Sequence, residues 1–304
     1  MLDARQLEAL AAVMEHGSFG AAAKALSLTL AAVSLRIKSL EGAMGQRLLV
    51  RGKQVRATPA GQALLGHVRQ VRLMEADLVA GLRGPGPGQP LQTLSVAVNA
   101  DSLTSWFLPG VADLLARHQL LLDVVIDDQD HTHDALKNGD VTGCVTTLAS
   151  AMRGCVAEPL GLMRYRCMAA PALIAQWTTP AGLVQPHRLL ASPAVIFNRK
   201  DALQDAFLAQ HLNLKNALYP RHFVPAVDAF ELALALGMGW GMVHDLLLQS
   251  NAAHQARKTL AEVLPGRTVD VALYWQHWAQ EPLLAQRLTQ AVKASAKARL
   301  LPLV

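Results

Sequence analysis

The stretch SFGAAAKALSLTLAAVSLRIKSLEGAMGQRLLVRGKQVRATPAGQALL (residues 18–65) decides the fold of the first quarter of this 304-residue chain. Ser18 and Thr29 are residue types that cap helix N-termini, and each precedes a run whose apolar residues recur at helical spacing. After them, LLVRGKQVRAT (48–58) has two short apolar-and-basic arms around a glycine, which predicts a β-hairpin. Together with a helical pattern before residue 17, these runs predict a winged helix-turn-helix unit over residues 1–58.

The next segment begins at Thr58-Pro59, an order of residues that favours the start of a helix, and predicts a helix over 59–83. Its apolar residues alternate spacings of four and three, which is typical of a seam between two helices. Glu75 interrupts this stripe, and a helix packed on its own head would show a similar pattern, so both alternatives stay open. If the stripe pairs two chains, the dimerisation residues are Leu64, Val68, Val71, Leu78 and Leu82.

The pattern changes after the long helix. GPGPGQP (84–90) is too rich in glycine and proline for a helix or a strand, and it predicts a flexible linker over 84–91. Over residues 92–304, short β-rich runs alternate with helical stretches, which predicts parallel α/β sheets in one large lobe or two smaller ones. The β-rich runs are LSVAV (94–98), LLLDVVI (120–126), GCVTT (143–147), AVIF (194–197) and WGMV (240–243).

Composition narrows the class of protein. Apolar residues make up 52% of the chain and charged residues 17%, which is enough to build packed cores and argues against disorder. The longest apolar runs fall short of the roughly 20 residues of a membrane helix, and the first ten residues lack the apolar segment of a secretory signal. The three cysteines form an odd set without CxxC spacing. We therefore expect a cytoplasmic protein of two or three domains, with reduced thiols and no membrane contact.

The net charge of +5 comes from the first part of the chain. Residues 1–83 contain 11 Lys and Arg against 6 Asp and Glu, whereas residues 84–304 contain 17 of each. Basic residues beside a helix of groove-entering size suit double-stranded DNA, because each neutralised phosphate releases counterions. The expected DNA-binding residues are Thr29, Ser34, Arg36 and Lys38 at the third helix, and Arg51, Lys53 and Arg56 on the hairpin.

These residues resemble the winged helix-turn-helix of LysR-type transcriptional regulators. The matching features are GSF, AA, A and L in the second helix, AVS, I and LE in the third, G, LL and R in the hairpin, and TPAG at the start of the long helix. Leu108-Pro109 and GMGWGMV (237–243) are similar to later motifs of the family, so the resemblance covers essentially the full chain. More narrowly, the segments that resemble the lysine- and arginine-responsive ArgP/LysG branch are SVAVNADSLTSW (95–106), AVSLRIKSLE (32–41) and YWQHWAQEP (274–282).

The resemblance implies an α+β fold in which residues 92–304 form a two-lobed, periplasmic-binding-protein-like domain with two strand crossovers as its hinge. Lobe I is expected at about residues 92–165 and 269–304, and lobe II at about 166–268. The effector is expected in the cleft between the lobes, where a basic amino acid needs carboxylates at one end and hydrogen-bond donors at the other. The expected effector-binding residues are Asp101, Ser102, Asp128, Gln129, Thr146, Asn198 and Asp228.

The sequence departs from the family at the start of the third helix. The usual Gln-Ser or Gln-Pro pair is Leu30-Ala31, and the frequent Arg, His or Gln after the serine of AVS is Leu35. Leucine and alanine can contact a thymine methyl group but cannot form bidentate hydrogen bonds with bases. We therefore expect DNA binding with a strong salt dependence and with weaker or shape-based discrimination between sequences.

Taken together, the residues and the resemblance predict a LysR-type regulator that binds double-stranded DNA, forms homodimers or tetramers, contacts RNA polymerase and responds to lysine or arginine. The alternative is an architectural DNA-binding protein whose body senses nothing. An enzyme is not expected, because GxSxG, P-loop and HExxH motifs are missing from the sequence and the cysteines suit the core. We expect no metal at DDQDHTHD (127–134), which is typical of a solvated loop, and no other cofactor.

Overall fold

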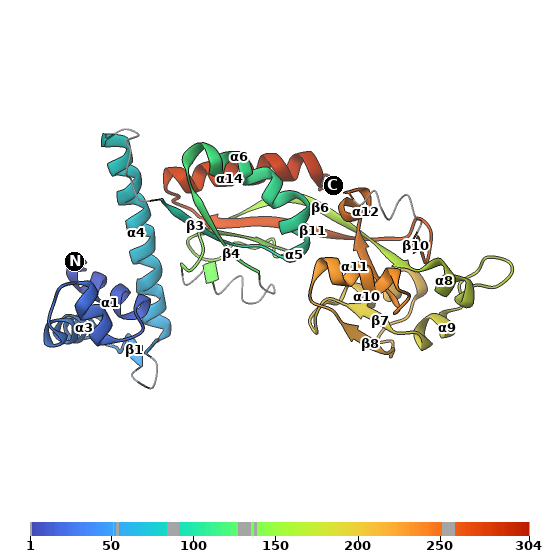
Figure 1. Cartoon of the computed structure of the whole chain (residues 1–304), viewed down its shortest axis with the longest axis horizontal. Helices are drawn as coiled ribbons and strands as arrows, with labels where there is room; N and C mark the ends of the chain where they lie inside the picture. The colour runs from blue at the N-terminus through green and yellow to red at the C-terminus, as the bar shows by residue number, and fades with distance from the viewer. Residues whose placement is uncertain are drawn as a thin grey trace.

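The computed structural model describes residues 2–50, 52, 55–83, 91–126, 135–136, 139–250 and 259–303. A small helical head lies at one end, a long helix stands beside it, and an elongated α/β body of two lobes follows, as Figure 1 shows. This architecture confirms the expected α+β class, with a winged helix-turn-helix followed by a two-lobed body.

The head consists of three helices and a two-stranded hairpin. Its second and third helices begin where the sequence predicts, because the Ser18 hydroxyl accepts the N–H of Ala21 and the Thr29 hydroxyl accepts the N–H of Ala32, both at 3.1 Å. The apolar faces of all three helices and of the hairpin meet in one buried core, which the start of the long helix closes. These elements are α1 (Ala4–Glu15), α2 (Phe19–Ala25), α3 (Leu30–Met44), β1 (Leu49–Val50), β2 (Arg56–Ala57) and the long helix α4 (Pro59–Arg83).

The body is built on a nine-stranded sheet with the order β4-β3-β5-β11-β6-β9-β7-β8, in which β10 pairs with β6. The prediction of parallel strands is correct for β4-β3-β5 and for β9-β7-β8, and wrong for the middle of the sheet, where β11 and β6 are antiparallel to their neighbours. The strands are β3 (Thr93–Ala97), β4 (Leu121–Val125), β5 (Gly143–Thr146), β6 (Cys155–Ala169), β7 (Ala194–Ile196), β8 (Arg221–Phe223), β9 (Trp240–His244), β10 (Ala261–Glu262) and β11 (Thr268–Trp278).

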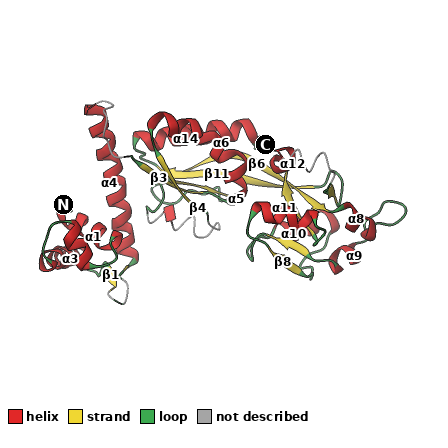
Figure 2. Ribbon diagram, in the orientation of Figure 1, coloured by secondary structure: helices red, strands yellow, loops and turns green. Residues whose placement is uncertain are grey.

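The two long strands β6 and β11 connect the lobes (Figure 2). They pair from Thr268 opposite Arg166 to Trp278 opposite Cys155, with one register shift between Leu273 and Tyr274. Because β5 pairs with one end of this ladder and β9 with the other, the ladder is the structural link between lobe I and lobe II.

Helices pack against the sheet in both lobes. In lobe I, the buried indole of Trp275 donates a hydrogen bond to the Thr289 hydroxyl at 2.8 Å and packs on Phe107, with ring centroids 6.2 Å apart. The helices of the body are α5 (Ala100–Ser102), the π-helical turn η1 (Leu103–Phe107), α6 (Leu108–His118), α8 (Pro171–Trp177), α9 (Pro186–Ala191), α10 (Leu203–Leu212), α11 (Val227–Ala235), α12 (Asp245–Ser250) and α14 (Leu283–Arg299).

The cysteines lie within the body as free thiols. Cys144 and Cys167 are buried, and Cys155 is half-buried. Burial raises the pKa of the Cys144 thiol to about 12, so this thiol stays protonated near neutral pH. Across the described ranges, no single helix has the length and hydropathy to span a membrane, although α2 and α3, bent by 107°, reach the threshold when counted together.

Candidate DNA-binding face and interlobe pocket

The exposed face of α3 is largely apolar in its first two turns. Leu30 is 55% exposed and Leu35 is 65% exposed, and Ala31 is exposed between them. The opposite face, formed by Val33, Ile37 and Leu40, is buried in the head core. The helix therefore presents leucine side chains, rather than long polar ones, to whatever binds the head.

The other residues expected at DNA differ in their positions. Lys38 and Arg56 are exposed, while Ser34 and Arg36 are half-buried. The Arg36 guanidinium donates to the backbone carbonyl oxygen of Arg5 at 3.5 Å, which directs it toward the start of α1. The Thr29 hydroxyl serves as the helix cap. Arg51 and Lys53 lie outside the described residues.

A carboxylate fixes the hairpin to the recognition helix. Glu41, on α3, accepts the backbone N–H groups of Leu48 at 2.9 Å and Leu49 at 3.3 Å through Oε1. The Thr58 hydroxyl then donates to the Arg47 carbonyl oxygen at 2.8 Å and accepts the N–H of Gly61 at 3.1 Å. These bonds fix the positions of α3, the hairpin and α4 relative to one another. Arg56, on the hairpin, therefore moves together with α3.

The apolar stripe of α4 divides into two parts. Val68 is buried and Leu64 half-buried against the chain's own head, which is the alternative that the sequence left open. Farther along, Leu78 is 63% exposed and Leu82 is 77% exposed, and Val71 is half-buried between the two parts. The expected dimer seam is therefore available mainly in the second half of the helix.

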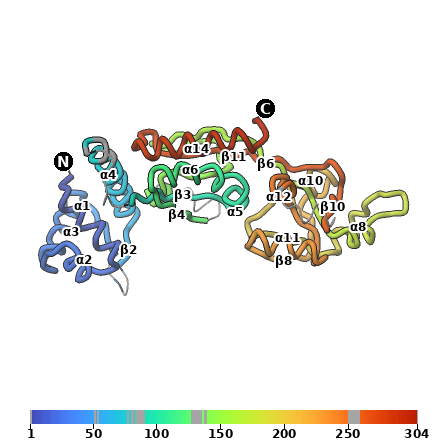
Figure 3. The backbone as a smooth tube through the Cα atoms, turned by 45° about the horizontal axis from the view of Figure 1, so that its top comes forward, coloured from blue at the N-terminus to red at the C-terminus, as the bar shows by residue number. Residues whose placement is uncertain are grey.

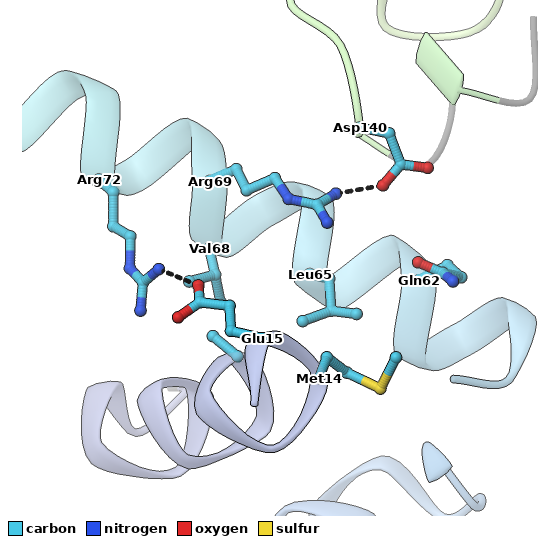
Figure 4. Close-up of a pocket in the computed structure, with 9 residues that line it drawn as sticks. Met14, Glu15, Gln62, Leu65, Val68, Arg69, Arg72 and Asp140 are labelled. Carbon is cyan, nitrogen blue, oxygen red and sulfur yellow. Dashed lines mark hydrogen bonds and ion pairs between the residues drawn. The ribbon is translucent and has the colours of Figure 1, made fainter. Parts of the chain in front are cut away.

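Helix α4 also joins the head to lobe I (Figure 3). A cavity of about 180 Å³ lies between α1, α4 and Asp140. Figure 4 shows the side chains that line it. Arg69 forms an ion pair with Asp140 across this junction, and Gln70 donates to the carbonyl oxygen of Gln280 at 3.2 Å. Gly139, with φ +68°, approaches so closely that a Cβ there would overlap the α4 backbone. The junction thus couples the position of α4 to a loop of lobe I.

A second cavity, of about 30 Å³, lies between the lobes and has room for one or two water molecules. Four polar side chains line it: Asp101 from α5, Tyr165 from β6, Asp201 after β7 and His244 at the end of β9. The rest of the lining is apolar and consists of Phe197, Leu203, Val227, Phe230, Met242, Val243 and Leu247.

Three of these polar groups are in contact. The hydroxyl of Tyr165 donates to Oδ2 of Asp101 at 2.8 Å, and Nε2 of His244 lies 3.9 Å from Oδ1 of the same carboxylate. The rings of Tyr165 and His244 meet edge to face with centroids 5.9 Å apart. Burial, together with the negative charge of Asp101, raises the pKa of Tyr165 well above its ordinary value, so the phenol remains a neutral donor.

His244 is held in one tautomer. Its Nδ1 accepts the backbone N–H of Leu247 at 3.2 Å, so the proton of the neutral ring is on Nε2. This Nε2 is buried and has no hydrogen-bond partner among the groups that the structure describes. Burial lowers the pKa of His244, although the charges of Asp101 and Asp245 oppose that shift. The ring therefore offers the cavity one unused donor.

Asp201 brings a second carboxylate to the same cavity. Its Oδ2 accepts the N–H of Phe197 at 3.3 Å, and its Oδ1 accepts the N–H of Leu203 at 3.0 Å. Burial raises the pKa of Asp201, and the negative charge of Asp101 raises it further. Because these two acids repel each other, a cation placed between them lowers the electrostatic energy of the site.

Of the expected effector-binding residues, Asp101 lines the cavity, and Asn198 lies outside the lining but holds the loop of a residue that does line it. The Asn198 side chain accepts the N–H groups of Lys200 at 2.8 Å and Asp201 at 3.1 Å, and so fixes the loop that carries Asp201. Asp228 is exposed at the start of α11 and is not part of the cavity lining.

The remaining expected effector-binding residues are not part of the cavity lining given above. Ser102 is fully buried beside Asp101, and its hydroxyl has no partner within the described part of the chain. Thr146 is buried at the end of β5, where its hydroxyl accepts the N–H of Leu148 at 3.2 Å. Asp128 and Gln129 lie outside the described residues, as does the segment 127–134 considered for a metal.

Sequence reasoning missed Tyr165, Asp201 and His244. A signal existed for two of them, because Asp201 follows the predicted strand 194–197 and His244 directly follows the predicted strand 240–243. Polar residues at strand ends are common at ligand sites in α/β folds. Tyr165 lies inside β6, a strand that the alternation of runs did not predict.

The chain matches two family descriptions. "Bacterial regulatory helix-turn-helix protein, lysR family" matches residues 4–62, and "LysR substrate binding domain" matches residues 87–297. The HTH-type transcriptional regulator ArgP of Pseudomonas aeruginosa is 40% identical over 296 residues, which cover 97% of this chain and 96% of that protein.

Solved structures give the same picture. The crystal structure of ArgP from Mycobacterium tuberculosis matches with a TM-score of 0.88 and 38% identity, over 100% of both chains. Full-length LysG from Corynebacterium glutamicum with bound effector Arg matches with a TM-score of 0.82 and 31% identity, over 99% of this chain and 100% of that one.

Proposed function

The chain belongs to the LysR family of bacterial transcriptional regulators, and we propose that its effector is a basic amino acid, lysine or arginine, bound between the two lobes. The observation that carries the proposal is the pair of carboxylates, Asp101 and Asp201, in a cavity whose described lining contains no lysine or arginine. Buried charges of one sign favour a ligand of the opposite sign, because pairing offsets the loss of hydration. An ammonium or guanidinium group meets that requirement.

The other end of an amino acid needs hydrogen-bond donors for its carboxylate. Ser102 and His244 supply a buried hydroxyl and a buried Nε2–H, neither with a partner among the described groups. Buried polar groups are usually satisfied, so these unused donors favour an acceptor-bearing ligand. His244 lines the cavity, and Ser102 is next in sequence to the lining residue Asp101. The proposed binding residues are therefore Asp101 and Asp201 for the cationic group and Ser102 and His244 for the carboxylate.

Binding requires a movement of the lobes. A cavity of about 30 Å³ is too small for an amino acid, and we propose that the lobes separate to admit one. The ladder of β6 and β11 is the natural hinge, because these strands connect the two lobes. The effector then acts through its different affinities for the open and closed arrangements.

The relatives agree with this choice of ligand class. LysG from Corynebacterium glutamicum, which aligns with 99% of this chain, has been solved with bound effector Arg. An amino acid with a guanidinium group also matches the two acids of this cavity in charge.

We also propose that the protein acts in the cytoplasm, where it can bind DNA, and that two chains pair through α4. The exposed apolar residues Leu78, Val79 and Leu82 lie near the C-terminal end of α4 and suit a helix–helix seam. Pairing would present two recognition helices to successive major-groove faces, and assembly into tetramers and contact with RNA polymerase are further parts of the proposal.

A thermal-shift screen with matched ligands tests the effector. Arginine and lysine are expected to raise the unfolding temperature, because a ligand that binds only the folded state stabilises it. Citrulline and norleucine, which have similar shapes without the side-chain charge, are expected to have no effect. Equal shifts with charged and neutral ligands, or no shift with any of the twenty amino acids, would contradict the proposal, and the second result favours a DNA-binding protein that senses nothing.

A further inference from the structure

The exposed leucines of α3 point to a mode of DNA sequence recognition. We infer that Leu30 and Leu35, with Ala31 between them, read the C5-methyl groups of thymines in the major groove. The inference rests on the family's DNA binding and is independent of the proposed effector. Leu30 is 55% exposed and Leu35 is 65% exposed, which is unusual for leucines on a helix whose other face is fully packed.

The chemistry of this face limits what it can recognise. The outward side chains of the first two turns are Leu30, Ala31, Ser34 and Leu35, and Ser34 is half-buried. The Thr29 hydroxyl, at the helix start, is occupied by the backbone of the same helix. Bidentate recognition of guanine or adenine requires the long polar side chains of arginine, lysine, asparagine or glutamine. The outward positions of these two turns have none of these residues, and Arg36, in the second turn, is half-buried and donates to the carbonyl oxygen of Arg5.

The groove of duplex DNA is the occupant that fits this face. Lys38 is exposed one turn after Leu35, and Arg56 is exposed on the hairpin. These cations can contact phosphates on the walls of the groove while the leucines contact its floor. Among the four bases, thymine alone presents a methyl group on the floor of the major groove. An apolar face with cationic neighbours is therefore complementary to a groove rich in thymine.

The spacing of the leucines predicts two separate thymine contacts. Leu35 follows Leu30 by five positions, which corresponds to a rise of about 7.5 Å along the helix and a rotation of about 140° around its axis. The two side chains therefore point in different directions from the helix and contact two separate methyl groups, on either strand.

Substitution of thymine by uracil tests the inference without changing any hydrogen-bonding group. A pool of random duplexes is selected on the full-length protein, and the best duplex is then prepared with dU in place of dT at one position at a time. We expect about a fourfold loss of affinity at each methyl that is read, from the value of one buried methyl group. Dependence on dT at two separate positions supports the inference.

Variants assign the effect to the side chains. In Leu35→Ala, and separately in Leu30→Ala, the difference between dT and dU should disappear at one of the two positions and persist at the other. Lys38→Ala is the matched control, because it should weaken binding to dT and dU duplexes equally and reduce the salt dependence. Circular dichroism verifies that each variant is folded, and both leucines are exposed, so their loss should leave the core intact.

The outcomes separate this inference from the function of the protein. One outcome is that the protein binds duplex DNA in a salt-dependent way but has equal affinities for dT and dU at every position of the selected duplex. This outcome overturns the inference and leaves DNA binding intact. A selection without sequence preference, or a dT preference that survives in both leucine variants, also overturns it. A failure to bind any duplex in dilute buffer would overturn DNA binding itself and the inference with it.

Discussion

Replacement of Asp101 by asparagine should weaken the binding of arginine about thirtyfold. The carboxylate is 27% exposed, accepts the Tyr165 hydroxyl at 2.8 Å and faces the interlobe cavity. Asparagine keeps the size of the side chain and an oxygen that can accept the same hydrogen bond, so the change removes mainly the charge.

The magnitude follows from the position of the carboxylate. Two opposite charges about 4 Å apart attract by about 4 kcal/mol at an effective dielectric constant of about 20. Solvent contact on about a quarter of the Asp101 side chain screens part of this attraction, and about 2 kcal/mol remains as a working value. That corresponds to a change in Kd of about thirtyfold.

Isothermal titration calorimetry with arginine measures this change directly. Asp228→Asn is the matched control, because it removes the same charge from an exposed position outside the cavity lining and should leave the Kd unchanged. The free Asp101→Asn protein should also be somewhat more stable to heat, since Asp101 no longer repels Asp201. An unchanged Kd in folded Asp101→Asn would refute the assignment of the cation site.

Three further predictions follow from the same geometry. Arginine affinity should fall as the pH is lowered below the ordinary pKa of histidine, because burial lowers the pKa of His244 and its protonation adds a positive charge 3.9 Å from Asp101. Arginine carries a net charge of +1, so repulsion of its cationic groups outweighs the gain at its carboxylate. His244→Gln should remove this step from calorimetric titrations across pH, and a pH-independent Kd in the native protein contradicts the prediction. Gly139→Ala should reduce the effect of arginine on DNA affinity while preserving arginine binding, because a Cβ at this position forces the loop away from α4. Gly17→Ala is the control, since Gly17 has a similar φ but open space around it. Equal behaviour of the two variants in DNA titrations argues against coupling through this junction. Charged residues at Leu78 and Leu82 should convert dimers to monomers in analytical ultracentrifugation with little change in the thermal stability of the head, and an unaltered mass would place the dimer seam elsewhere.

The head could be predicted in detail because its signals are local. Ser18 and Thr29 cap the helices that follow them, and the apolar spacing of α3 correctly gave its buried face. The same spacing on α4 was ambiguous, because a stripe that packs on the head and a stripe that pairs two chains look alike in one sequence. Only the exposures of Leu78 and Leu82 against the burial of Val68 separate the two parts.

The middle of the sheet could not be read from local pattern. Strand β6 contains Arg164 and Arg166, which make it polar, and their partners are far away in sequence. Arg164 pairs with Asp270 at 2.7 Å, and Arg166 pairs with Asp245 at 2.6 Å. Charges that are neutralised by distant segments hide a strand from any argument based on alternation.

The expected effector pocket and the interlobe cavity share one residue and the same kind of charge. An acidic site was expected, and Asp101 is part of it, but the second acid in the cavity is Asp201 rather than Asp228. The β7-end loop, held by Asn198, turns Asp201 inward, whereas Asp228 stays at the surface as an exposed residue of the first turn of α11. His244 directly follows the predicted strand 240–243, but the tautomer of its ring is defined only by the hydrogen bond from the N–H of Leu247.

The most direct test of the account measures the Kd of arginine by calorimetry in the absence and in the presence of saturating duplex DNA. If arginine controls DNA binding, DNA must change the arginine affinity by the same factor, and couplings of this kind are about 5- to 150-fold. We predict a difference in that range, with no heat from citrulline in either state. An identical arginine Kd with and without DNA, or no arginine binding at all, would contradict the account.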